Sequence, residues 1–595
     1  MDEQNKNLFL AFGLSLLVLV GWFALFPPPA PPQPGEIAPG QLLPPAPAAA
    51  EGTVPGAEPV VAAVRVAIEA PRLAGTISLT GGRIDDLRLL DHFETTQPGS
   101  DNVHLFNPVG GAAAPFYALY GWTPRGALDF DQVPGPNTVW EQVGDNALTP
   151  SNPVMLRWNN GAGLVFTRQI TIDANFMFTV TQGVENQTDA AVQLDPWGIL
   201  AQHGLPADLE NFFISHEGMI RMADGRLTED SYKTMRGYRV NERERTPFSD
   251  AAVERDGWIG LTGKYFMATL IGTPGQGFTA VAQHVPGADI YQVSIRQPTV
   301  TVEPGGRAEA GSMLFAGPKE WATMRAYERD LGIKGFIDAI DWGWFFFLTK
   351  PIFMALHFFN SIIGNMGWAI LALTLVIKAI LLPLAWKSYV SMAKMKDLQP
   401  EMLAIKERAG DDRQKMQQEM MKLYKEKKVN PAAGCLPILL QIPIFFSLYK
   451  VIFVTIELRH APWLWVFNDL SAPDPTSIVN LFGLLPWAAP HPGSFMALIL
   501  IGIMPLMFGA TMWLQMRLNP APTDPMQATI FNWMPWIFMF VMGGFASGLL
   551  LYWIGNNIIT FTQQYLIMRL NGSKPDLLGN IFGGLMKKKK GGAAK

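Results

Sequence analysis

The chain has 595 residues, of which 49% are hydrophobic and only 16% are charged, and its formal net charge is −4. This length leaves room for more than one domain, and the apolar content is too high for an ordinary soluble multidomain protein. The single cysteine, Cys435, excludes an internal disulfide, and its place at the start of an apolar run favours a buried thiol over a nucleophile.

The N-terminal segment predicts an uncleaved membrane anchor. Residues 8–26 are uncharged and long enough to span a hydrocarbon core of ~30 Å. Pro27 follows at once, and the first small-residue stretch suited to signal-peptide cleavage, at 48–50, lies well downstream. We therefore expect a transmembrane anchor over residues 1–26 and an extended Pro/Ala-rich linker over residues 27–59.

Residues 60–318 predict a soluble all-β domain, mostly antiparallel and of the sandwich type. Short alternating runs are separated by Gly and Pro, and the clearest strand pair covers residues 164–184. The carboxylates and histidines of this domain, such as His203, His216 and Glu217, follow no spacing typical of a metal site or an acid–base pair. They are predicted to be surface residues.

From residue 319 to residue 366 the pattern becomes helical and rich in aromatic residues. Trp342, Trp344 and Phe345 lie close to Lys350 in the sequence. This composition indicates a linking helix followed by an amphipathic helix that lies in the membrane interface. An additional membrane span is the alternative interpretation.

The C-terminal half predicts five further spans, which makes six with the anchor. They cover residues 367–386, 435–456, 495–516, 531–543 and 549–568, so that the last four lie in the region 433–570. Lysines and arginines concentrate in the loop 387–432 and in the tail 571–595, which places both in the cytoplasm. With six spans the N-terminus is also cytoplasmic, and the β domain lies on the other side of the membrane.

The basic loop is predicted to form a helical hairpin over Met395–Lys428. Apolar residues recur in steps of three and four along both arms, as in a coiled coil, and Gly410 ends the first arm. Two interpretations stay open. The hairpin is either a solvated element that only sets the topology, or a docking arm for ribosomal RNA, a nascent chain or a targeting receptor.

Lys378 is the one charge in the apolar stretch 368–383. The next cation, Lys387, is nine residues further on, or roughly 14 Å along a helix. A charge at such a depth costs on the order of 3 kcal/mol, so it should face protein or water. It is either a structural lysine paired with a hidden carboxylate or a positive charge in a hydrated site within the membrane.

Further polar residues in the spans are predicted to line one hydrophilic groove with Lys378. They are Thr374, Gln441, Asn556, Asn557, Thr560 and Gln563. Helical spacing places several of them on shared faces, although single amides in spans more often only join helices. Tyr552 and Trp553 are candidates for an exit path. Lys450, in contrast, is expected to snorkel to the outer interface near Glu457.

The sequence contains no nucleotide-binding GxxxxGK[ST] motif, no carboxylate in the core of a span and no Ser/His or paired-Asp arrangement in the spans. A pump, an ion-coupled transporter and an intramembrane protease are therefore not supported. We predict no enzyme activity, no cofactor and no metal.

Several short motifs of the C-terminal half resemble the YidC membrane protein insertases, in order from about residue 342 to residue 570. They are Met392–Lys396, Leu398–Pro400, Asn430-Pro431 with Gly434-Cys435, Gln441–Phe445, Asp524–Gln527, and Ser547–Leu549 with Tyr552. The β domain is similar to that of the Gram-negative members of the family, at Phe176–Val180 and at Trp258–Leu261 with Lys264-Tyr265.

The resemblance implies a polytopic α-helical membrane protein with a five-helix core around a hydrophilic groove, and a periplasmic β-supersandwich domain. In that family the groove cation is usually arginine, and it falls where this sequence has Lys378. The implied activity is insertion of nascent proteins into the bacterial inner membrane, alone or with the Sec translocon. The implied partners also include the ribosome, the signal-recognition receptor and membrane lipids, with Lys587, Lys588, Lys589 and Lys590 as candidate docking residues.

Two other functions stay open from the sequence. A membrane-anchored glycan-binding or sugar-epimerising protein would need paired His and Glu residues in a cleft of the β domain. A lipid scramblase would use the same groove as an insertase.

Overall fold

The computed structural model describes residues 64–126, 128–209, 215–240, 245–410, 412–427, 429, 436–464, 466–485, 487, 501–519 and 525–572. The predicted anchor, the Pro/Ala-rich linker, Lys428, Cys435 and the predicted docking residues Lys587–Lys590 lie outside the described residues.

The first part of the described chain is built from strands. Their bounds are β1 Arg65–Glu69, β2 Leu73–Ser78, β3 Arg83–Phe93, β4 Asn102–Phe106, β5 Phe116–Arg125, β6 Glu141–Val143, β7 Val154–Asn159, β8 Leu164–Ile172, β9 Met177–Asn186, β10 Val192–His203, β11 Gly218–Ala223, β12 Arg226–Ser231, β13 Phe248–Val253, β14 Gly257–Thr262, β15 Phe266–Gly272, β16 Phe278–Val285, β17 Ile290–Arg296, β18 Val300–Val302 and β19 Arg307–Pro318.

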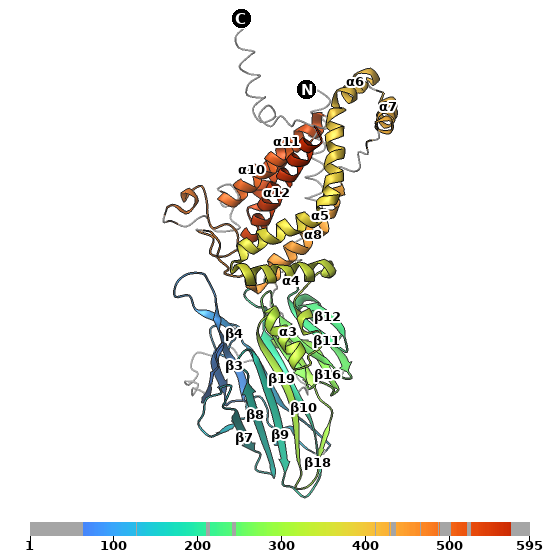
Figure 1. Cartoon of the computed structure of the whole chain (residues 1–595). Helices are drawn as coiled ribbons and strands as arrows, with labels where there is room; N and C mark the ends of the chain where they lie inside the picture. Colours follow the sequence, from blue (N-terminus) through green and yellow to red (C-terminus); the bar gives the residue numbers. More distant parts are fainter. Residues whose placement is uncertain are drawn as a thin grey trace. The chain divides into compact units, whose positions relative to one another are not determined.

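These strands form two sheets (Figure 1). The ten-stranded sheet has the order β1-β2-β3-β5-β10-β17-β16-β13, with β4 beside β3 and β18 beside β10. The nine-stranded sheet has the order β12-β11-β14-β15-β19-β9-β8-β7-β6. The strand pairs of both sheets are antiparallel. The predicted all-β sandwich is thereby confirmed.

The strand pair predicted most clearly from the sequence is β8 with β9. Leu164 pairs with Asn186 at one end and Ile172 with Phe178 at the other. The turn is held by Asp173, whose Oδ1 accepts the backbone N–H of Asn175 at 2.8 Å. An Asp side chain that bonds the backbone two residues on is typical of tight turns, which is why the strand pattern breaks here.

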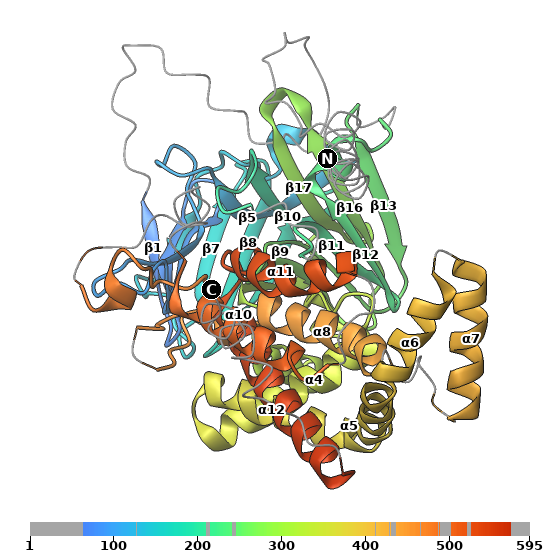
Figure 2. The same cartoon turned by 90° about the horizontal axis from the view of Figure 1, so that it is seen from above.

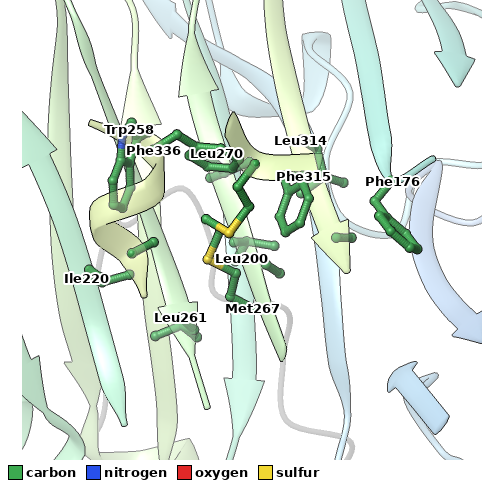
Figure 3. Close-up of a cluster of buried hydrophobic side chains, with 14 of the residues drawn as sticks. Phe176, Leu200, Ile220, Trp258, Leu261, Met267, Leu270, Leu314, Phe315 and Phe336 are labelled. Carbon is green, nitrogen blue, oxygen red and sulfur yellow. The ribbon is translucent and has the colours of Figure 1, made fainter. Parts of the chain in front are cut away.

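The inner faces of the two sheets share one hydrophobic core, part of which Figure 3 shows. Phe336 enters this core from the segment after helix α3 (Trp321–Asp330), and its ring meets Phe315 edge-on at 5.2 Å and Trp258 at 5.8 Å. The Tyr327 hydroxyl of α3 donates to Asp173 Oδ2 at 2.6 Å. The linking helix is therefore fixed to the strands through both its own side chains and the segment that follows it.

Helix α2 (Tyr232–Arg236) lies between β12 and β13, and α3 follows β19. The helical part of the chain comes after α3. Its bounds are α4 Phe346–Ile363, α5 Met366–Asp397, α6 Gln399–Ala409, α7 Arg413–Glu426, α8 Leu436–Val454, α10 Ile503–Met516, α11 Pro525–Met542 and α12 Ser547–Leu570. Helix α5 packs on α4, α8 and α12, and α10 packs on α11 and α12 (Figures 1 and 2).

By length and composition, α4 and α5 are the helices in the described part of the chain that could cross a membrane, and shorter apolar helices accompany them. Helix α5 begins at a cap in which Asn365 Oδ1 accepts the N–H of Trp368. It continues beyond the predicted end of the second span, residue 386, to Asp397. The number of six spans stays a prediction.

Helix α4 has two distinct faces. Ile352, Phe353 and Leu356 are buried, whereas Phe346 and Phe358 are among the exposed apolar residues. Since the exposed face is itself apolar, it suits contact with lipid. Whether α4 lies in the interface or spans the bilayer stays a prediction.

Helices α6 and α7 form a hairpin that projects away from the other helices in both views (Figures 1 and 2). Met402 and Ile405 of α6 are buried together with Leu423 of α7. Asp412 caps α7 by accepting the N–H groups of Gln414 and Lys415. The apolar seam read from the sequence is thus internal to the hairpin, and a docking role stays a prediction.

Arg168 is a charged residue that is only 1% exposed, and it joins the two sheets. From β8 in one sheet, its guanidinium donates to the carbonyl of Tyr120 in β5 of the other sheet at 2.6 Å, and to the carbonyls of Gly81 and Gly82 at 3.0 and 2.9 Å. It also lies over the Trp140 ring at 4.5 Å. Burial lowers the pKa of this guanidinium, so the carbonyls must compensate for its lost hydration.

We predict that Arg168→Met lowers the free energy of unfolding of the strand-forming part by about 3 kcal/mol, because buried carbonyls lose their donor. Hydrogen exchange of the backbone amides in β5 and β8 of the full chain measures this change. Arg157→Met, at an exposed position of β7, is the matched control and should change little. Equal effects of the two substitutions would contradict the role of Arg168.

Candidate functional site in the helical bundle

A chain of hydrogen bonds joins three helices around Lys378. The Nζ of Lys378 in α5 donates to Gln441 Oε1 in α8 at 3.1 Å. The Nε2 of Gln441 donates in turn to the Tyr552 hydroxyl in α12. One amide therefore connects the charge predicted from the sequence with a buried phenol.

The partner of Lys378 is neutral. Among the described residues, no carboxylate oxygen lies within the 4.0 Å of Nζ that would define an ion pair. An ammonium has three N–H donors and the bond to Gln441 uses one, so two can reach water or a ligand. Within the described part of the chain, Lys378 is therefore not a structural lysine paired with a carboxylate.

The other predicted groove residues divide into two groups. Gln563 of α12 donates to the backbone carbonyl of Lys378 at 3.4 Å, so it lies beside the site. Thr374 donates to the carbonyl of Ile370 in its own helix at 2.7 Å. Asn557 donates to Thr511 of α10 at 3.3 Å and joins two helices. Gln441 and Gln563 thus gather at Lys378, whereas Thr374 and Asn557 are bonded elsewhere.

Four polar atoms of α12 are buried without a hydrogen-bond partner in the described part of the chain, and two of them belong to predicted groove residues. These two are Asn556 Oδ1 and Thr560 Oγ1. Tyr552, Asn556 and Thr560 are spaced by four residues and share one face of the helix. An unsatisfied buried polar group costs about 1–3 kcal/mol, so this face suits water or a polar segment of a ligand.

Tyr552 and Trp553 have different surroundings. Tyr552 is 1% exposed and belongs to the interior network. The ring of Trp553 is partly buried and lies 5.1 Å from Phe445 and 6.1 Å from Phe508. Both residues pack in the described bundle, and an exit path along them stays a prediction.

Gln564 was not predicted from the sequence, although it is 1% exposed and donates to Asn519 Oδ1 at 3.0 Å. The step of four residues from Thr560 to Gln564 was the available signal, since it continues the face of Asn556 and Thr560. Ser447 of α8 was also missed, and its buried hydroxyl has no partner in the described part of the chain.

The prediction for Lys450 was wrong. Instead of snorkelling beside Glu457, Lys450 is 8% exposed and forms an ion pair with Asp341 at 2.5 Å. Asp341 also accepts the backbone N–H of His216 at 2.9 Å. Snorkelling is unnecessary because the tertiary structure brings a carboxylate to the lysine, and helical spacing along α8 could not reveal a partner outside that helix.

Comparison with known proteins identifies relatives along the full chain. The model of the 60Kd inner membrane protein family matches residues 358–574, and that of the YidC periplasmic domain matches residues 65–355. A Dinoroseobacter shibae protein named membrane protein insertase YidC is 60% identical, with 99% of each chain covered. A Cereibacter sphaeroides protein of the same name is 59% identical, and the match covers 98% of this chain and 95% of the relative.

Among solved structures, an active YidC insertase with its first transmembrane domain resolved is 20% identical, with a TM-score of 0.36. The match covers 85% of this chain and 93% of that one.

We predict that Lys378→Met leaves the melting temperature of the purified chain in detergent unchanged or raises it, because no carboxylate is left unpaired. Lys450→Met is the matched control in the neighbouring helix. It leaves Asp341 without its cation and should destabilise the protein by on the order of 3 kcal/mol. If both substitutions lower the melting temperature equally, Lys378 has a structural partner.

Proposed function

Since the chain belongs to the YidC family of membrane protein insertases, we propose that it carries nascent inner-membrane proteins into the bilayer through a hydrophilic groove centred on Lys378. The observation that carries this proposal is the neutral hydrogen-bonded setting of Lys378. Its bond to Gln441 orients the ammonium without cancelling its charge. The groove therefore keeps a positive charge that an incoming segment can meet.

The proposed mechanism is physical. A short polar segment of the substrate enters the groove and exchanges part of its hydration for hydrogen bonds with Lys378 and with the polar face of α12. The apolar segment of the substrate then moves into lipid beside the helices. Burial of ~20 apolar residues supplies the free energy, so no nucleotide is consumed by this protein. The protein is an insertase and not an enzyme.

The lysine gives the groove a particular selectivity. Its compact ammonium attracts acidic groups, but it lacks the planar fork with which arginine holds a carboxylate in two bonds. A substrate carboxylate is consequently attracted to Lys378, but it is released more readily than it would be from a guanidinium.

We further propose a topology and a set of partners. The basic hairpin Met395–Lys428 and the basic tail support a cytoplasmic location for both termini and a periplasmic location for the β domain in the inner membrane. The lysines and arginines that concentrate in the sequence of the hairpin and the tail suit the ribosome and the signal-recognition receptor. The Sec translocon and membrane lipids complete the proposed partners.

The alternative of a sugar-binding or sugar-epimerising protein is not favoured, since relatives that match along the whole chain are named insertases. The histidines considered for such chemistry are also engaged otherwise. His216 Nε2 bonds the Met219 carbonyl at 2.8 Å, and His203 bonds the Tyr117 hydroxyl at 3.3 Å. A scramblase that uses the same groove is tested by reconstitution with labelled lipid.

We predict that Lys378→Met impairs insertion selectively for substrates whose translocated segment is acidic, because the attraction to carboxylates is lost. Lys378→Arg should insert the same substrates at least as well as the natural protein, since guanidinium keeps the charge. Reconstituted vesicles and a pair of two-span substrates that differ only in acidic against neutral residues measure the difference. An equal loss for both substrates would refute a role for the charge.

We predict that replacing Lys587, Lys588, Lys589 and Lys590 by alanine weakens ribosome binding, and that binding to the natural protein falls as salt is raised. Co-sedimentation of the purified chain with ribosomes at two ionic strengths measures both effects. Binding that depends neither on salt nor on these lysines would leave the tail with a topogenic role only.

A further inference from the structure

A second candidate site lies apart from Lys378, where the strands meet α4 and α8. It is a cavity of about 1000 Å³, and neither Lys378 nor Gln441 lines it. Glu229 of β12, Asp341 and Trp344 of the segment before α4, and Lys450 of α8 contribute to its wall. This volume is sufficient for a small ligand or for the polar part of a lipid.

The charges that line this cavity do not cancel. Lys450 pairs with Asp341 at 2.5 Å and Lys350 pairs with Asp338 at 2.6 Å, so these four groups form two neutral pairs. Glu229 lines the same cavity, and no lysine, arginine or histidine nitrogen of the described residues lies within 4.0 Å of its carboxylate.

His216 does not supply the missing positive charge. Burial lowers the pKa of its imidazole and outweighs the bond from Nε2 to the Met219 carbonyl, which raises that pKa. Among the described residues that line the cavity, Glu229 is therefore the one carboxylate without an ion-pair partner. Burial raises the pKa of this carboxyl, whereas the positive charges of Lys450 and Lys319 lower it.

Aromatic rings also line the cavity. Trp344 is 94% exposed and Phe446 is 47% exposed, and the rings of Phe345 and Phe446 stack with their centres 6.5 Å apart. Aromatic faces attract ammonium groups, and they do so best beside a carboxylate that can accept the N–H groups. A cavity wall that contains both a carboxylate and these rings thus suits an organic ammonium.

The cavity also continues into an apolar surface. Phe346 lines it and is 55% exposed, and the adjacent Phe347 of α4 is 60% exposed. Exposed Trp and Phe side chains at the start of an apolar helix are typical of the level at which lipid headgroups meet acyl chains. A ligand that is ammonium at one end and hydrocarbon at the other fits both parts.

We propose that this cavity binds a phospholipid with a primary ammonium headgroup, of the phosphatidylethanolamine type. The ammonium donates to Glu229 between the aromatic rings, the phosphate lies toward Lys350, and the acyl chains follow Phe346 and Phe347. This inference goes beyond the proposed insertion activity and depends only on α4 meeting the lipid. A lysine side chain of a passing substrate is the competing occupant.

The test uses the full chain reconstituted with equal amounts of phosphatidylethanolamine and phosphatidylglycerol that carry identical acyl chains. Native mass spectrometry after extraction counts the lipids that stay bound. The natural protein should retain the ethanolamine lipid preferentially, and Glu229→Gln should reduce this preference roughly tenfold, because one charge-assisted bond is lost. Glu303→Gln, at an exposed position between β18 and β19, is the matched control and should retain the preference.

Two further variants keep the test decisive. Trp344→Ala removes an almost fully exposed ring, so it should weaken retention without unfolding the chain even if Glu229→Gln is unstable. Lys378→Met, which should impair insertion, should retain the ethanolamine lipid as the natural protein does, and this separates the two proposals. Equal retention of both lipids by the natural protein, or an undiminished preference in Glu229→Gln and Trp344→Ala, would overturn the inference.

Discussion

An ammonium group in an apolar stretch must be hydrogen-bonded, hydrated or neutralised, and the arrangement of the helices around Lys378 follows from that constraint. The structure meets it with the amide of Gln441 and not with a carboxylate. The amide accepts from Lys378 and donates to Tyr552, so α5, α8 and α12 are joined at one point. Since an amide carries no charge, the site remains positive. That residual charge is what the proposed activity uses.

Helix α8 also carries a lysine whose charge is neutralised by a carboxylate. Lys450 of α8 is buried and forms a neutral pair with Asp341, which belongs to the segment that follows the strands. Gln441 and Lys450 are nine residues apart, or roughly 14 Å along α8. At one end of α8, Lys450 therefore anchors the helix to the segment before α4 through a neutral ion pair. Toward the other end, Gln441 accepts a hydrogen bond from Lys378, whose charge stays uncancelled. The chemistry of each lysine is decided by its partner and not by its residue type.

The interior of the bundle is polar along one face of α12. Tyr552, Asn556, Thr560 and Gln564 are all buried and recur every four residues. Tyr552 and Gln564 have side-chain partners, whereas Asn556 Oδ1 and Thr560 Oγ1 have none in the described part of the chain. Unsatisfied polar groups would be a pure cost in a bundle that only had to be stable. In the proposed groove they are hydrogen-bonding sites that a polar segment can use once it enters.

Local periodicity and composition were enough to predict the strand alternation of the sandwich, the β8–β9 turn at Asp173, the apolar helices and the isolated charge of Lys378. The motifs of the sequence also indicated the family. Tertiary structure alone decided that Gln441 meets Lys378, that Asp341 meets Lys450, and that Thr374 bonds within its own helix. Helical spacing shows which residues share a face, but it does not show which other helix that face contacts. Such contacts depend on packing between segments that are distant in the sequence.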